Sequence, residues 1–145
     1  MSEIKIKLAA GTDVGLVRKN NEDNFVVNRD LSQSEWIIPQ SSETIPLGKY
    51  GTLLVVADGM GGTNAGEVAS AIAIETVQNA FTPEKLENIV TLEDEMVTEE
   101  AIEEFLTKTV KAADLNIVNA SKEDSSTQGM GTTIVIAWIL NEKAY

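Results

Sequence analysis

Residues 55–70, VVADGMGGTNAGEVAS, contain the pattern that decides the fold. An apolar run typical of a β-strand ends at Asp58, and a helix-like series of small residues follows it. Gly59, Gly61 and Gly62 lie between the two. A turn alone needs fewer glycines than this, so the excess indicates that other groups approach the backbone closely there.

The residues before this stretch predict three strands joined by long loops. Apolar and polar residues alternate at 4–8, and a second strand-like run occupies 24–28. The near-continuous apolar run at 50–58 predicts a strand that is buried on both faces. Residues 11–24 predict a functional loop, and residues 29–49, which have prolines and no clear period, predict a long surface insertion.

The second half of the chain predicts helices followed by strands. Helical periodicity runs from 64 to 80, a new helix starts at Thr82–Pro83, and an amphipathic helix of about five turns covers 102–117. The acidic stretch 91–100 is expected to be a solvated linker and helix start. A loop at 121–131, a strand at 132–140, a tight turn and the opening of another strand follow. This order predicts an antiparallel α+β layered fold rather than a parallel sheet.

Composition excludes several classes of site and partner. The chain has 145 residues, enough for one domain, and carries 23 acidic and 11 basic residues for a net charge of −12. That charge weighs against nucleic acid or an anionic membrane as partner. Because cysteine and histidine are absent, a metal must be held by oxygen ligands, which favours magnesium, manganese or calcium.

The two ends of the sequence give two further expectations. The first ten residues lack the apolar core of a signal peptide, and no later run is long enough for a membrane span, so a cytoplasmic location is expected. At the other end the chain stops just as a strand begins. We therefore expect a shortened chain or a gene fragment.

Three carboxylates stand at predicted strand ends, namely Glu22, Asp23 and Asp58. Oxygen-rich strand edges of this kind bind hard divalent cations. Glu22 and Asp23 are neighbours and point to opposite sides of an extended chain, so one should bind an ion directly and the other should orient water or a nearby group. The alternative is a solvated acidic pair, with Asp58 as a helix cap.

Arg18 lies four residues before Glu22 and belongs to the same predicted loop. A guanidinium group beside metal-binding carboxylates suits a phosphate ester, which it grips with two parallel hydrogen bonds. Two cations a short distance apart would activate a water for in-line attack on such an ester. Taken alone, Arg18 is an ordinary surface charge, so this role depends on its neighbours.

Three blocks of the sequence together resemble one enzyme family. TDVGLVRKNNEDNF (12–25), LLVVADGMGGTNAGEVAS (53–70) and GMGTTIVIAW (129–138) look like the first three sequence blocks of the metal-dependent protein phosphatases, the type 2C or PPM family. The resemblance implies an α-β-β-α sandwich of antiparallel sheets with a binuclear Mg²⁺ or Mn²⁺ site. It also implies hydrolysis of phosphoserine or phosphothreonine in proteins.

The resemblance also implies roles for individual residues. Asp58 would bridge both metals, and the carbonyl of Gly59 would bind one of them. Glu22 and Asp23 would bind a metal directly or through water, and Arg18 would hold the substrate phosphate. Gly61 and Gly62 would be structural glycines near the site.

Two departures from the family pattern bear on activity. Many members have a histidine that protonates the leaving group where Met60 or Thr63 stands here. The family's later Gly-Asp-Ser-Arg segment and two further metal-binding aspartates are also absent. We therefore expect these residues to be weakly active or inactive on their own. The alternative is a non-catalytic PPM-like module that binds metal, phosphate or a protein.

The expected partners follow from the same interpretation. A phosphoprotein is the expected substrate, and a cognate serine/threonine kinase or its targets are the expected functional partners. Residues 1–145 are interpreted as part of one phosphatase domain, with 29–49 as the insertion. Exposed sheet edges would invite pairing with a second copy, so a homodimer is a further hypothesis.

Overall fold

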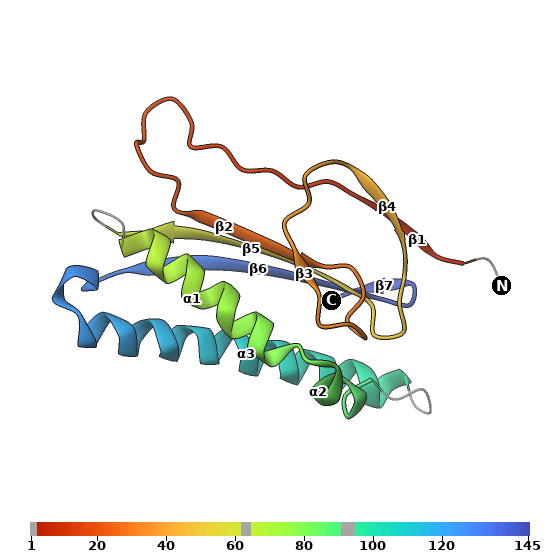
Figure 1. The fold of residues 1–145 in the computed structure, drawn as a ribbon. Coiled ribbons are helices and arrows are strands. Elements are labelled where there is room, and N and C mark those ends of the chain that lie inside the picture. Colours follow the sequence, from red (N-terminus) through yellow and green to blue (C-terminus); the bar gives the residue numbers. More distant parts are fainter. Residues whose placement is uncertain (1–2, 62–64, 91–94) are drawn as a thin grey trace.

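A computed structural model describes residues 3–61, 65–90 and 95–145 (Figure 1). A block of strands is followed by a block of helices and then by further strands, which is the order that the sequence predicts for an α+β fold. The elements are β1 (Lys5–Leu8), β2 (Asp23–Asn28), β3 (Trp36–Ile37), β4 (Glu43–Pro46), β5 (Thr52–Met60), α1 (Ala65–Ala80), α2 (Pro83–Glu87), α3 (Glu95–Glu123), the 3₁₀ turn η1 (Ser125–Thr127), β6 (Gly131–Leu140) and β7 (Lys143–Ala144).

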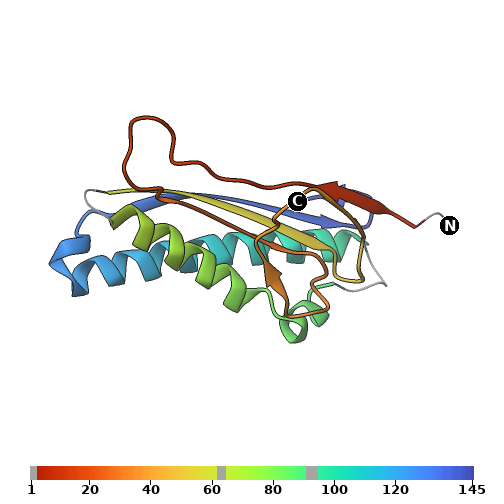
Figure 2. The same ribbon diagram turned by 45° about the horizontal axis from the view of Figure 1, so that its top comes forward.

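The main sheet has five strands in the order β3-β2-β5-β6-β7, all antiparallel to their neighbours. β5 is its centre and pairs over its length with β6, while β2 covers the other edge of β5 from Asp58 back to Leu53. The long helices α1 and α3 lie together on one face of this sheet (Figures 1 and 2).

The core lies between the helices and the sheet. Phe81, Phe105 and Trp138 form an edge-to-face aromatic cluster, with the Phe81 and Trp138 ring centroids 5.2 Å apart. The indole Nε1 of Trp138 donates a hydrogen bond to the Tyr50 carbonyl oxygen at 2.7 Å, so its one polar atom is satisfied in the core.

A second, two-stranded sheet of β1 and β4 belongs to the opposite face of the main sheet. Leu8 and Ile45 of this small sheet pack with Val27 of β2, and Leu54 of β5 contacts the same cluster. The N-terminal segment thereby crosses the face that the helices leave open (Figure 2).

Residues 29–49, predicted as a long surface insertion, contain the short strands β3 and β4, and the Arg29–Glu43 ion pair at 2.9 Å ties the segment together. Two expectations about other elements were wrong. β5 is not buried on both faces, since Val56 is 53% exposed. α3 has 29 residues and extends past the expected 102–117 at both ends, because polar residues in the added turns hide its period.

The remaining boundaries agree with the predicted elements to within a few residues. Thr82 and Pro83 start α2 as expected, although the Thr82 side chain makes no capping hydrogen bond. Asn64, the expected start of α1, and residues 91–94 of the acidic stretch lie outside the described residues, and the rest of that stretch opens α3, as the expected helix start. None of the described helices is both long enough and apolar enough to cross a membrane.

Candidate metal and phosphate site

Asp23 and Asp58 are direct partners in the pairing of β2 with β5. Both are exposed and lie on the face opposite the helices. Loss of surrounding water, followed by the neighbouring Asp58 carboxylate, raises the pKa of Asp23. Two carboxylates side by side repel each other unless a cation or a shared proton compensates. This oxygen-only pair therefore fits a hard divalent cation.

Glu22 turns to the other side of the chain. A Cβ atom on Gly66, in the first turn of α1, would lie 2.8 Å from the Glu22 Cδ and Oε1 atoms, so the carboxylate rests against this helix start. A carboxylate at a helix N-terminus is favoured by the helix dipole. The sequence predicts this opposite placement of Glu22 and Asp23, and it separates their possible roles.

The backbone of Glu22 is fixed from the helix side. Its carbonyl oxygen accepts hydrogen bonds from the Ser70 hydroxyl at 2.7 Å and from the Gly59 amide at 3.2 Å. Ser70 is fully buried, and the sequence interpretation missed it. The sequence offered one signal for this role. Ser70 lies four residues after Gly66, so both fall on the same buried side of α1.

The glycines after Asp58 are explained by the packing of α1. A Cβ on Gly59 would lie 2.1 Å from the Gly66 carbonyl oxygen, and one on Gly61 would lie 2.9 Å from the Ala65 Cβ. The same Cβ on Gly59 would lie 2.7 Å from the Glu22 carbonyl oxygen, so the groups that approach Gly59 closely are backbone atoms of Gly66 and Glu22. Gly62 and Thr63 lie outside the described residues.

Arg18 reaches the site from an ordered loop. Its Nη1 donates to Glu22 Oε2 at 3.1 Å, while the arginine side chain is 68% exposed and the glutamate side chain only 12%. Asn21 holds the base of the loop, because its Nδ2 donates to Thr12 Oγ1 at 2.7 Å and its Oδ1 accepts from the Asp23 amide at 3.1 Å. Arg18 is therefore oriented by Glu22 and remains accessible to a ligand.

These residues surround a polar hollow of about 230 Å³. Its lining is Asp13, Val14, Arg18, Asn20, Asn21, Glu22, Asp23 and Asp58. Asp13 and Asn21 line the hollow but were not among the predicted site residues. The feature that could have indicated them is the Asn- and Asp-rich composition of their loop. Within residues 3–61, 65–90 and 95–145, no three acidic side chains converge as one metal-binding group.

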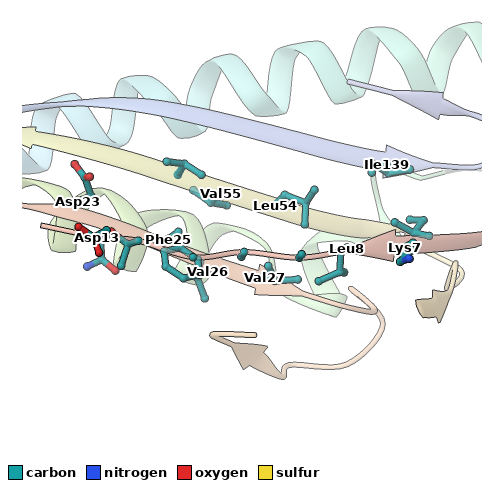
Figure 3. A pocket seen from close by; sticks show the side chains of 17 residues that line it. Lys7, Leu8, Asp13, Asp23, Phe25, Val26, Val27, Leu54, Val55 and Ile139 are labelled. Atoms are coloured by element: carbon teal, nitrogen blue, oxygen red, sulfur yellow. The ribbon is translucent and has the colours of Figure 1, made fainter. Parts of the chain in front are cut away.

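A larger and mostly apolar hollow of about 730 Å³ adjoins the acidic one. It lies between the N-terminal segment and the open face of the sheet, with Asp13 and Asp23 at one end (Figure 3). Phe25, Val26 and Leu54 line its apolar part. The carboxylates thus stand where the polar and apolar parts of this face meet.

A sequence comparison decides the family. The family model described as "Protein phosphatase 2C" matches residues 46–145, more than half of the chain. The chain belongs to the protein phosphatase 2C family.

Curated members of the family have similar sequences. Serine/threonine phosphatase stp of Listeria monocytogenes is 32% identical over 126 residues, which are 87% of this chain and 40% of the relative. Protein phosphatase PhpP of Streptococcus pneumoniae is 27% identical over 135 residues, which are 92% of this chain and 43% of the relative. The chain spans about 40% of the length of these curated relatives.

Solved structures of bacterial phosphatases have the same fold. A bacterial serine phosphatase variant superposes with a TM-score of 0.63 and 25% identity over 97% of this chain and 50% of that chain. The catalytic domain of serine threonine protein phosphatase PstP, solved with two manganese ions, gives a TM-score of 0.58 and 26% identity over 97% and 45%. These similarities confirm the predicted α+β sandwich fold, and the described chain corresponds to part of that fold.

Proposed function

We propose that this chain forms part of a phosphatase domain that hydrolyses phosphoserine and phosphothreonine in proteins with Mg²⁺ or Mn²⁺. The observation that carries the proposal is the facing pair Asp23 and Asp58 beside the exposed guanidinium of Arg18. Family membership supports it, because the relatives described above are named serine/threonine phosphatases.

Asp58 and Asp23 are the residues best placed to hold a cation, and we assign the bridging role between two ions to Asp58. The Gly59 carbonyl is a further proposed ligand. Bound ions of this kind supply an activated water and stabilise charge on the phosphoryl group. PstP, crystallised with two manganese ions, supports a metal centre of this composition.

Arg18 is the proposed phosphate-binding residue. A guanidinium group matches two phosphate oxygens with parallel hydrogen bonds, and most of the Arg18 side chain is open to solvent. Glu22 contacts Arg18 and the start of α1 rather than Asp58, so its proposed role is to orient Arg18 and to hold metal-bound water.

A non-catalytic module that binds metal or phosphate is the second candidate. It is favoured by the lack of a three-acid group among the described residues and by the absence of histidine as a proton donor. The proposed substrates are phosphoproteins, and a kinase acting on the same proteins is the proposed functional counterpart. Self-association through the open sheet edge remains a hypothesis, tested by light scattering.

The first test is Mn²⁺ binding by calorimetry to the wild type and to Asp58→Asn, with p-nitrophenyl phosphate turnover measured alongside. We expect the variant to lose Mn²⁺ binding and to keep its circular dichroism spectrum, because the Asp58 side chain is exposed on the face opposite the helices. Asp114→Asn, an exposed acid on α3, is the matched control and should bind like the wild type.

The outcomes separate the two candidates. Mn²⁺ binding with turnover supports the phosphatase, and binding without turnover supports the module for this chain. Equal Mn²⁺ affinity in the wild type and Asp58→Asn would remove Asp58 as a ligand and with it the proposed metal centre.

A further inference from the structure

Asn21 stands at the junction between the loop that carries Arg18 and strand β2, which begins at Asp23. Its side-chain amide is used on both sides. Nδ2 donates a hydrogen bond to Thr12 Oγ1 at 2.7 Å, and Oδ1 accepts one from the Asp23 amide at 3.1 Å. One half-buried side chain therefore connects the two ends of the loop and the first residue of the strand.

The contact with Asp23 fixes a peptide unit that is also held from the helix side. The carbonyl of Glu22 and the amide of Asp23 belong to one planar peptide group. Its oxygen accepts from the Ser70 hydroxyl at 2.7 Å and from the Gly59 amide at 3.2 Å, while its N–H donates to Asn21. Because this plane is held at both ends and neighbouring side chains of an extended chain alternate, the directions of the Glu22 and Asp23 side chains are set together.

The contact with Thr12 closes the loop that presents Arg18. Thr12 and Asn21 are nine residues apart, and their hydrogen bond brings the two ends of the intervening segment together. Within that segment the Arg18 side chain is 68% exposed and contacts Glu22 at 3.1 Å. An exposed side chain on an open loop would sample many positions, so closure at the base limits where the guanidinium group can lie.

We propose that Asn21 is a positioning residue that places the carboxylate of Asp23 and the guanidinium group of Arg18 relative to each other. The inference rests on the proposed function, in which these two groups bind metal and phosphate. Asn21 acts on Asp23 through the strand amide and on Arg18 through Thr12. Asparagine suits this role because its amide offers both a donor and an acceptor and adds no charge beside the acidic pair.

The two contacts of Asn21 can be removed separately. Asn21→Ala removes both, whereas Thr12→Val removes only the hydroxyl group at the base of the loop, and Thr12→Ser keeps a hydroxyl there. Calorimetry measures the affinity of each variant for Mn²⁺ and, in a separate titration with Mg²⁺ present, for inorganic phosphate. Chemical denaturation measures the free energy of unfolding. Asn88→Ala is the matched control, because Asn88 also donates through Nδ2, to the Glu84 carbonyl oxygen at 3.1 Å at the exposed end of α2.

We expect Asn21→Ala to weaken Mn²⁺ and phosphate binding by about tenfold each, as found for residues that orient a metal ligand. Thr12→Val should weaken phosphate binding by about fivefold, the effect of one lost hydrogen bond, and should leave Mn²⁺ affinity nearly unchanged. Thr12→Ser should restore phosphate binding, and Asn88→Ala should bind both ligands like the wild type. A general loss of stability would instead weaken both affinities in Thr12→Val.

Two kinds of failure are distinguishable. Wild-type affinities in Asn21→Ala, with Mn²⁺ binding lost in Asp58→Asn and phosphate binding weakened in Arg18→Ala, would overturn the inference and leave the proposed function standing. Mn²⁺ binding that is indifferent to Asp58→Asn, with phosphate binding indifferent to Arg18→Ala, would overturn the proposed function and the inference with it.

Discussion

The two faces of β5 carry opposite kinds of side chain. Leu53, Val55 and Ala57 point toward the helices and are at most 1% exposed. Val56 and Met60 point the other way, are 53% and 56% exposed, and stand on either side of Asp58. Because side chains alternate along a strand, one segment supplies both the centre of the core and the centre of the candidate site.

The comparison shows where the rigidity of the candidate site originates. The open face contributes little burial near Asp58, whereas the helix side supplies close backbone packing at Gly59 and the hydrogen bond from Ser70 to the Glu22 carbonyl. The carboxylates are thus placed by contacts from the opposite face. Variants on the helix side should show how far stability and metal binding can be separated.

The largest effect on stability is expected for Trp138→Ala on the helix-covered face. Loss of this fully buried ring and of its partners Phe81 and Phe105 should lower the free energy of unfolding by about 3–5 kcal/mol. Chemical denaturation followed by circular dichroism measures this change. Trp36→Ala, at a half-buried ring on β3, should cost clearly less, and an equal loss in both variants would contradict the assigned centre of the core.

Gly59→Ala should affect both the packing on the helix-covered face of β5 and the metal site on its open face. The added Cβ meets backbone atoms of Gly66 and Glu22, so unfolding should become easier by about 1–3 kcal/mol and Asp58 should shift relative to Asp23. Denaturation and Mn²⁺ calorimetry read the two effects. Gly131→Ala, whose nearest contact would be Met60 Cγ at 3.7 Å, is the control. Wild-type stability in Gly59→Ala would mean that this packing is looser than described.

Ser70→Ala should have the smallest effect on stability, about 1 kcal/mol, because one buried hydrogen bond to Glu22 is lost. Its effect on the site should be clearer, as weaker Mn²⁺ binding with an unchanged circular dichroism spectrum. Ser121→Ala removes a comparable serine bond on the exposed side of α3 and should leave Mn²⁺ affinity unchanged. If both serine variants bind Mn²⁺ alike, Ser70 supports the fold alone.

The sequence predicted the elements whose side-chain period is strong. The alternation at 4–8 became β1, and the small residues after Asp58 became the helix that packs tightly on the sheet. β3 was missed because two residues cannot show a period, and β4 was missed because it has one buried apolar residue, Ile45, next to a proline. The exposure of Val56 was missed because an apolar run does not reveal what covers its second face.

Prediction of the candidate site was limited in the same way. Local spacing identified Arg18, Glu22, Asp23 and Asp58 as one group, and the structure brings them around one hollow. Ser70 contacts Glu22 across 48 residues of sequence, and no local pattern encodes such a pairing. The opposite directions of Glu22 and Asp23 were predictable, because neighbours in an extended chain alternate.

The pairing of Asp23 with Asp58 also constrains how the sheet can assemble. If β2 slipped by one residue so that Asp23 paired with Ala57, side chains of β2 would exchange faces, and Asp23 would turn toward the apolar layer beneath the helices, where Ala57 is fully buried. Placing a charge there without a partner is strongly unfavourable. The acidic residue proposed as a metal ligand therefore also selects the correct strand alignment during folding.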